Sequence, residues 1–274
     1  MKVDDQIEVK KIVKKSGSSF FWGMNVLDSE RKRAMFSIYA FCRIVDDLAD
    51  ETEKPKKERE AELLRWKNGI ENGFSSPNEI QLRIEDLINR HGIERELFID
   101  LIRGMEMDLN GEAYETFDDL KLYCYRVASV VGLISLKLFG ANVERSMDYA
   151  INLGYALQLT NIIRDLAEDH SLGRVYLPHE EIVSFGLSNN TLVESSGSKS
   201  FLELMKFQAE RADVFYNIAN EKLPPEDFRA LKTARSMGKI YRSLLTKMKK
   251  DNFRVVEKRY RINSFKKIFL MIVS

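Results

Sequence analysis

The scarcity of strand and turn signals is the feature that most limits the fold of this chain. The 274 residues include 14 Gly and 5 Pro, and no hairpin dipeptide lies between alternating apolar runs. Apolar residues instead recur at helical spacing, and helix-capping patterns precede several of these runs, as at Thr116 and Asp119. Pro178 begins a short predicted helix that Gly186 ends. We therefore predict an all-α protein with one domain spanning residues 1–274.

Apolar periodicity and cap residues together predict nine long helices. They cover residues 29–51, 57–72, 77–90, 94–110, 117–139, 144–170, 197–220, 226–250 and 253–272. Ser76 is the expected N-cap of the third helix, and Pro224-Pro225 separates the predicted helices 197–220 and 226–250. Segment 185–196 is rich in Gly, Asn and Ser and is the clearest predicted loop.

Composition and charge exclude several classes of protein. With 43 Lys plus Arg against 42 Asp plus Glu, the net charge is +1, so we expect no nucleic-acid partner. Cys42 and Cys124 form neither a disulfide framework nor a zinc signature. Residues 1–15 lack the apolar stretch of a signal peptide, and residues 127–140 are too short to span a bilayer. We expect a cytoplasmic protein, whose basic C-terminal region with apolar residues 268–273 could contact a membrane surface from the cytosolic side.

A first polar stripe lies on the predicted helix 29–51. Tyr39, Arg43, Asp46 and Asp50 are spaced by four, three and four residues, so they share one face, while Phe36 and other apolar residues occupy the opposite face. Two carboxylates one turn apart repel each other unless a cation lies between them, and carboxylates are good ligands for hard cations. The spacing therefore indicates half of a metal site.

A second polar stripe lies on the predicted helix 144–170. Gln158, Asn161, Asp165 and Asp169 share one face of an otherwise apolar helix, which favours an interior cavity over open solvent. One Asp-x-x-x-Asp pattern alone is usually a solvated helix face. Here an arginine accompanies each pair of aspartates, Arg164 in this helix, and both pairs belong to coherent polar stripes.

Two such helices facing one another across a central cavity would suit a specific chemistry. Mg²⁺ ions held between them would bind a diphosphate and stabilise it as a leaving group. Departure of diphosphate from an allylic carbon leaves a carbocation, so the rest of the cavity should be apolar and aromatic, which excludes water and stabilises cations on ring faces.

Ordered sequence blocks resemble the squalene/phytoene synthase family over most of the chain. The blocks are Ser18-Ser19-Phe20, Tyr39 to Asp50, Tyr123 to Gly132, Gln158 to Asp169, and Gly173-Arg174-Val175-Tyr176-Leu177-Pro178. The resemblance implies an isoprenoid synthase fold, with helices around a central apolar cavity and two facing Asp-rich helices. It also implies a prenyl transferase that couples two isoprenoid diphosphates head to head.

The resemblance also implies roles for individual residues. The implied magnesium-diphosphate ligands, which are also catalytic, are Asp46, Asp50, Asn161, Asp165 and Asp169. The implied diphosphate contacts are Ser19, Tyr39, Arg43, Arg164 and Tyr241. The implied wall of the hydrocarbon channel comprises Val127, Val131, Gly132, Leu157 and Gln158. Phe20 resembles part of a flap over the pocket, and Tyr123 resembles a tyrosine proposed to assist proton removal or to stabilise the cation.

The substrate is the finer question. Ser16 to Phe20 and Tyr125 to Ser129 are most similar to bacterial presqualene diphosphate synthases of hopanoid pathways, which favours farnesyl diphosphate. The implied cofactor is Mg²⁺, for which Mn²⁺ can substitute; NADPH would be needed only if the product were reduced to squalene. The alternatives are a phytoene synthase acting on geranylgeranyl diphosphate and a non-catalytic assembly factor on the same fold. The Tyr123 to Gly132 block argues against a terpene cyclase, and the oligomeric state stays open.

Overall fold

The computed structural model describes residues 24, 27–51, 53–263, 267 and 269–270. No strand occurs in these described parts of the chain, which confirms the prediction of an all-α protein. The helices before the middle of the chain are α3 (Ser29–Asp50), α4 (Lys56–Asn72), α5 (Glu79–His91), α6 (Arg95–Asn110), α7 (Phe117–Cys124), η1 (Tyr125–Ser129) and α8 (Val130–Phe139). The later ones are α9 (Val143–Ser171), α10 (His179–Ser184), η2 (Asn189–Thr191), α11 (Lys199–Glu221), η3 (Pro225–Asp227) and α12 (Lys232–Lys250).

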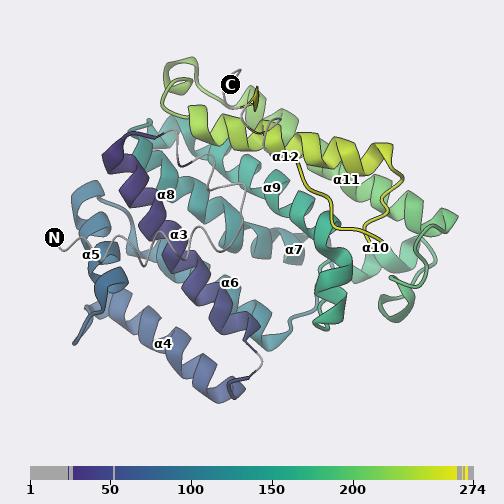
Figure 1. The fold of residues 1–274 in the computed structure, drawn as a ribbon, viewed down its shortest axis with the longest axis horizontal. Coiled ribbons are helices and arrows are strands. Elements are labelled where there is room, and N and C mark those ends of the chain that lie inside the picture. Colours follow the sequence, from purple (N-terminus) through teal and green to yellow (C-terminus); the bar gives the residue numbers. More distant parts are fainter. Residues whose placement is uncertain (1–23, 25–26, 52, 264–266, 268, 271–274) are drawn as a thin grey trace.

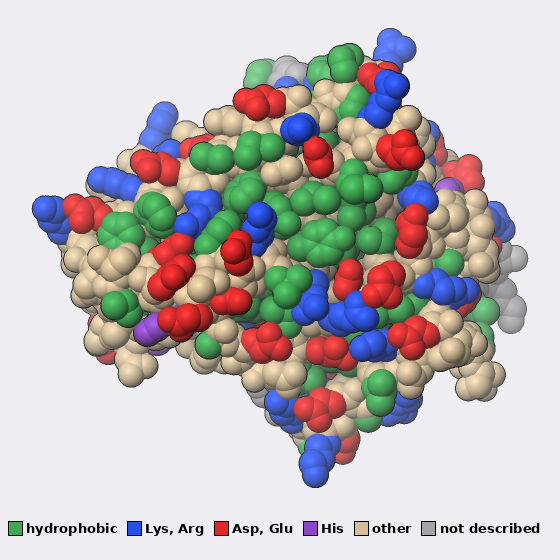
Figure 2. All heavy atoms as spheres, turned by 180° about the vertical axis from the view of Figure 1, so that it is seen from behind, with side chains coloured by type: hydrophobic (Ala, Val, Ile, Leu, Met, Phe, Trp, Pro, Cys, Tyr) green, Lys and Arg blue, Asp and Glu red, His purple; other side chains and the backbone are tan. Residues whose placement is uncertain are grey.

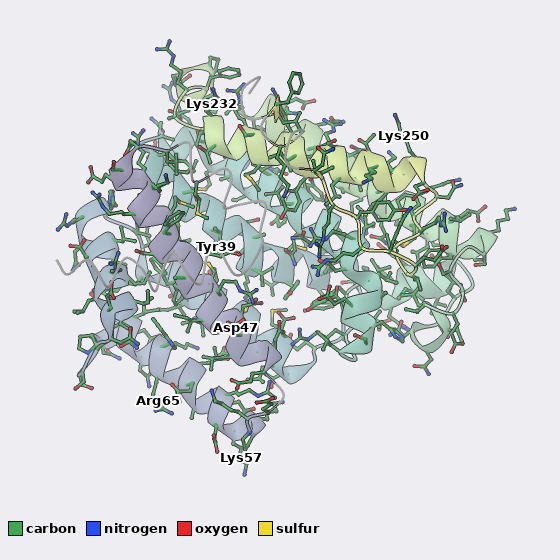
Figure 3. The ribbon with its side chains drawn as sticks, viewed as in Figure 1. Tyr39, Asp47, Lys57, Arg65, Lys232 and Lys250 are labelled. Atoms are coloured by element: carbon green, nitrogen blue, oxygen red, sulfur yellow. The ribbon has the colours of Figure 1, made fainter. Side chains whose placement is uncertain are left out.

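The long helix α9 lies at the centre of the bundle, where α8, α11 and α12 pack against it (Figure 1). Helix α3 lies on the other side of the molecule and packs on α4, α5 and α6. Phe41 fixes α3 there, because its ring makes edge contacts with Trp66 and Phe98 at centroid distances of 5.3 and 5.5 Å. The polar stripe of α3 lines a cleft of the bundle, and its first member, Tyr39, is labelled in Figure 3.

The predicted helix 117–139 is confirmed in extent, but its middle is wound differently. Between α7 and α8 the chain forms the π-helical turn η1, a distortion that often marks functional sites. Ser129 at the end of η1 donates a hydrogen bond of 2.9 Å to the carbonyl of Ile151 on α9. Gly154 lies against the backbone of the same serine, so that η1 and α9 approach closely.

Most predicted helix boundaries lie within two residues of the observed ones, and three features of the prediction differ more. Asn78, not Ser76, caps α5, because its side chain and that of Gln81 form a reciprocal capping box. The helix predicted from residue 226 is broken, since η3 precedes a turn and α12 begins at Lys232. The predicted helix 253–272 is wrong for residues 253–263, which are not helical.

Segment 253–263 leaves the helical path at its start. Asn252 and Phe253 have φ of 51° and 50°, a left-handed conformation that ends α12. Phe253, Val255, Tyr260 and Ile262 are nevertheless buried, at spacings that no single helix face provides. Their apolar character reflects packing of a segment of turns and irregular chain onto the bundle, and the sequence pattern alone predicted a helix there.

The surface carries both signs of charge. In the view from behind, apolar side chains gather across the middle of the face, with acidic and basic side chains interspersed around them (Figure 2). By length and composition, the stretch Phe117–Phe139 is the one described helix that could cross a membrane. More than half of its apolar window, 56%, is buried inside the bundle, as in the core helix of a soluble protein.

Candidate active site

Both polar stripes line one cleft with a volume of about 1050 Å³. Its walls are formed by α3, α6, α7, η1, α9 and α12, by residues 172–176 after α9, and by the C-terminal segment from Arg259 onward. The predicted site residues in this cleft are Tyr39, Arg43, Asp46, Asp50, Tyr123, Val127, Gln158, Asn161, Arg164, Asp165, Asp169 and Tyr241. The fold thus brings together residues that lie up to two hundred positions apart in the sequence.

An apolar cavity of about 250 Å³ adjoins the polar cleft. The two share wall residues, namely Tyr39, Cys42, Val127, Gln158 and Asn161. The apolar cavity also contains the remaining predicted channel residues, Val131, Gly132 and Leu157. Ser19 and Phe20, the predicted diphosphate contact and flap residue, lie outside the described residues.

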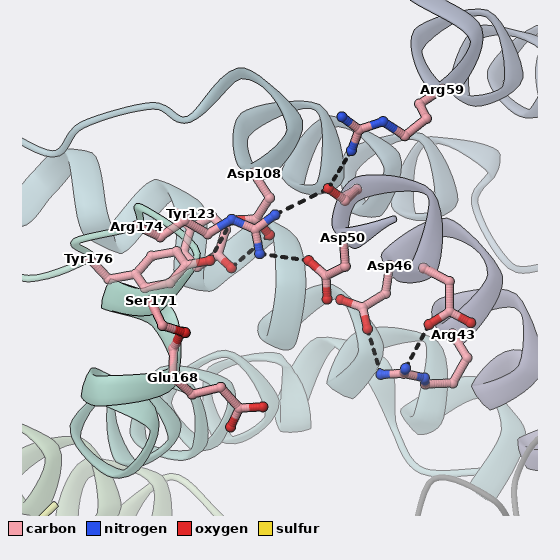
Figure 4. A network of polar contacts seen from close by, with 12 residues as sticks. Arg43, Asp46, Asp50, Arg59, Asp108, Tyr123, Glu168, Ser171, Arg174 and Tyr176 are labelled. Atoms are coloured by element: carbon pink, nitrogen blue, oxygen red, sulfur yellow. Dashed lines mark hydrogen bonds and ion pairs between the residues drawn. The ribbon is translucent and has the colours of Figure 1, made fainter. Parts of the chain in front are cut away.

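Arginines balance the carboxylates of α3. Arg43 donates hydrogen bonds of 2.6 Å to both Asp46 and Asp47, and Arg174 donates one of 2.6 Å to Asp50 (Figure 4). Burial in the cleft, together with repulsion from Asp50, raises the pKa of Asp46 to about 7. The stripe is therefore an anionic surface whose charges repel one another, and a bound cation would relieve that repulsion.

The carboxylates of α9 show the same pattern. Arg164 donates a 2.8 Å hydrogen bond to Asp165, and Arg259 of segment 253–263 forms an ion pair of 3.1 Å with the same carboxylate. Burial, together with repulsion from Asp165, raises the pKa of Asp169 to about 7. Burial also raises the pKa of Tyr241, which lies beside Arg164.

The donor set of the two stripes fits a hard divalent cation. All five predicted ligands offer oxygen, and the Asn161 Oδ1 atom is buried without a hydrogen-bond partner, which costs free energy unless a ligand pairs with it. Within the described parts of the chain, no three Asp, Glu, His or Cys side chains form a ready-made metal cluster. An ion in this cleft would therefore draw ligands from substrate or water as well, as Mg²⁺ usually does.

Asp108, for which the sequence alone predicted no role, lies on α6 in the same cleft. Its carboxylate accepts hydrogen bonds of 2.9 Å from Tyr123 and 2.7 Å from Tyr176. The available signal was its position: Asp108 shares a helix face with the apolar Leu101 and Met105, where a solvated aspartate is not expected.

For the basic C-terminal residues, the sequence led us to expect contact with a membrane surface, whereas the structure places several of them in the cleft. Arg259, Arg261 and Lys267 line the cleft, and Arg259 additionally pairs with Glu168 at 2.7 Å. These cations therefore face the acidic site; segment 253–263 is not helical and brings Arg259 within ion-pair distance of Asp165 and Glu168 on α9. Membrane contact through the apolar residues 268–273 stays a prediction, since most of them lie outside the described residues.

Comparison with known proteins gives the family. Residues 13–266 match the squalene/phytoene synthase family. A presqualene diphosphate synthase of Rhodopseudomonas palustris is 36% identical over 231 residues, which cover 84% of this chain and 82% of that protein. A phytoene synthase of Arthrospira platensis is 32% identical over 280 residues, covering 96% of this chain and 89% of that protein.

A solved structure agrees with this relationship. A crystal structure of a dehydrosqualene synthase in complex with ligand superimposes with a TM-score of 0.85 at 29% identity, covering 98% of this chain and 95% of that one. The fold class predicted from the sequence is thereby confirmed as that of the isoprenoid synthases. The chain belongs to the squalene/phytoene synthase family and is a prenyltransferase.

Proposed function

We propose that this enzyme condenses two molecules of farnesyl diphosphate head to head to form presqualene diphosphate. The observation that carries the proposal is the joining of a polar cleft, lined by two acidic stripes and several arginines, to an apolar cavity through shared wall residues. Such a site suits a ligand with an anionic head and a long apolar tail. The similarity to a presqualene diphosphate synthase favours the shorter of the two candidate substrates.

The polar end of the site would bind and ionise the diphosphate. Asp46, Asp50, Asn161, Asp165 and Asp169 would hold Mg²⁺, or Mn²⁺ in its place. The metal supplies neutralisation of the charge that develops on the departing diphosphate. Arg43 and Arg164, which now pair with carboxylates of the stripes, would turn to the diphosphate oxygens together with Ser19, Tyr39 and Tyr241.

The apolar end would hold the hydrocarbon chains and protect the carbocation. Water would be excluded from the cation left by the first substrate by the channel residues Val127, Val131, Gly132, Leu157 and Gln158. The double bond of the second substrate attacks that cation, and loss of one proton closes a cyclopropane that still carries one diphosphate. Tyr123, buried in the wall of the polar cleft, would stabilise the cation and assist removal of the proton.

A phytoene synthase is the second candidate. It is favoured by the Arthrospira platensis relative, whose alignment covers more of this chain than that of the presqualene diphosphate synthase. The same chemistry would then join two geranylgeranyl diphosphates, whose chains are five carbons longer. The reaction ends at the cyclopropyl diphosphate unless the enzyme ionises that intermediate again, and formation of squalene would additionally consume NADPH.

Competition between the two substrates tests the proposal. Purified enzyme with Mg²⁺ and without NADPH is given equal concentrations of farnesyl and geranylgeranyl diphosphate, and the lipid products are identified by mass spectrometry. Presqualene diphosphate as the main product supports the proposal. Phytoene or its cyclopropyl precursor as the main product would assign the enzyme to the second candidate function.

A further inference from the structure

Asp108 joins a tyrosine cluster to the catalytic cleft. The rings of Tyr123 and Tyr176 stack with a centroid distance of 5.0 Å, and Tyr114 lies 5.5 and 5.9 Å from them. The hydroxyls of Tyr123 and Tyr176 donate to different oxygens of the Asp108 carboxylate, Oδ2 and Oδ1 (Figure 4). With its proton directed at Asp108, the Tyr123 oxygen keeps its lone pairs available to accept another proton.

Asp108 also stands between two hollows of the protein. Together with Arg174 and Tyr176 it lines both the catalytic cleft and a second pocket of about 310 Å³. The second pocket is also lined by Glu112 and His170. A proton that reaches Asp108 from the cleft side therefore has a polar route away from the reacting carbons and the diphosphate.

The charges around Asp108 suit a group that takes up and releases a proton near neutral pH. Burial raises its pKa to about 6, although the hydroxyls of Tyr176 and Tyr123 and the nearby Arg174 oppose the increase. The further acidic groups that act on it are Asp46 and Asp50 of α3 and Asp169 of α9. A base with a pKa close to the working pH both accepts a proton in the reaction and gives it up afterwards.

We propose that Asp108 acts through Tyr123 as the final acceptor of the proton lost when the cyclopropane closes. This inference rests on the proposed head-to-head condensation. The substrate C–H bond breaks, its electron pair forms the last C–C bond of the ring, and the proton passes to the Tyr123 oxygen. In the same event Tyr123 gives its own proton to Asp108 Oδ2, so that the phenol is restored and Asp108 becomes a neutral acid. Asp108 then releases the proton toward the second pocket.

The relay separates Asp108 from the groups that ionise the diphosphate. Replacing Asp108 by Asn keeps the shape of the side chain but removes the proton acceptor. Ionisation and coupling then continue while ring closure slows, and water captures the waiting coupled cation as an alcohol that keeps both hydrocarbon chains and one diphosphate. The expected loss of cyclopropyl product is about 10²-fold, within the range for removal of a general base. Diphosphate release should fall much less.

The test is therefore a ratio of products. Cyclopropyl lipid and released diphosphate are measured for the wild type, Asp108→Asn and the control Tyr114→Phe, which removes a hydroxyl of the same ring cluster. Among the described residues no hydrogen bond joins that hydroxyl to Asp108, so the control should keep the wild-type ratio. In Asp108→Asn the ratio of cyclopropyl lipid to released diphosphate should fall at least tenfold, with the coupled alcohol making up the difference.

Three results would overturn the relay. An unchanged ratio in Asp108→Asn, whether both rates stay normal or fall together, would show that Asp108 does not act at proton loss. A large increase in the Mg²⁺ concentration needed for half-maximal activity would make Asp108 a metal ligand instead. The double variant Asp108→Asn/Tyr123→Phe is the third comparison. If its fold-decrease in activity equals the two single fold-decreases multiplied together, the two residues act independently. If the wild type forms no coupled lipid, the proposed function itself fails and the relay falls with it.

Discussion

The contact between η1 and α9 makes the substitution Gly154→Ala a sharp test of the structure. A methyl group on Gly154 would lie 2.5 Å from Ser129 Cα, 2.6 Å from its Oγ and 2.7 Å from its backbone nitrogen. Backbone atoms cannot move aside without shifting η1, so the cost should reach about 3 kcal/mol, the upper end for overpacking. Alanine recovers about 1 kcal/mol through its better helix propensity. The net loss of about 2 kcal/mol corresponds to a decrease in Tm of roughly 4–8 °C.

Gly238→Ala on α12 is the matched control. Its methyl group would meet only the Leu153 Cδ1 atom, at 3.1 Å, and the end of a leucine side chain can rotate away. This variant should be as stable as the wild type or up to about 1 kcal/mol more stable. Thermal unfolding followed by circular dichroism measures both. Equal Tm values for Gly154→Ala and Gly238→Ala would refute the close packing of α9 on η1.

Three further predictions follow from the charged groups. Asp165→Asn should lower turnover by more than the roughly 10–100-fold typical of residues that only support a metal ligand, with unchanged circular dichroism; near-normal turnover would contradict the proposed metal site. Asp46 and Asp169 have pKa values raised from 3.8 to about 7, so the metal-free protein should lose stability as pH rises between these values. Urea unfolding at pH 5 and pH 7 should show a smaller loss of stability in Asp169→Asn than in the wild type. Arg211 donates a hydrogen bond of 2.9 Å to the buried Glu181 carboxylate, and Arg211→Met would leave that carboxylate without its cation. Urea unfolding should then show a decrease of about 3 kcal/mol in the free energy of unfolding. A decrease below about 1 kcal/mol would refute the pairing as a source of stability.

The sequence was sufficient for the helical class and for both acidic stripes, for the same physical reason. Helical spacing of apolar residues and of Asp46 with Asp50 is a local property, so it survives without knowledge of packing. Capping at Thr116 was likewise correct, because a capping box involves only residues three positions apart. That the two stripes face each other was a prediction about packing, which came from chemistry and family resemblance rather than from spacing.

Features that depend on tertiary contacts could not be predicted in this way. The π-helical turn η1 has no distinct periodicity over five residues, and it is tied to α9 through Ser129. Segment 253–263 was mistaken for a helix because its apolar residues bury against distant parts of the chain. Asp108 was missed because its position on an apolar helix face signals burial but not a role, and its role depends on tyrosines fifteen or more positions away.

The stoichiometry of the reaction tests head-to-head coupling in this cleft most directly. Purified enzyme with Mg²⁺ and farnesyl diphosphate, without NADPH, is sampled over time for substrate consumed, diphosphate released and lipid formed. Head-to-head condensation that stops at the cyclopropyl stage predicts one diphosphate released for every two substrates consumed, with presqualene diphosphate as the lipid. One diphosphate for each substrate, with a monomeric alcohol or cyclic hydrocarbon as the product, would contradict coupling in this cleft.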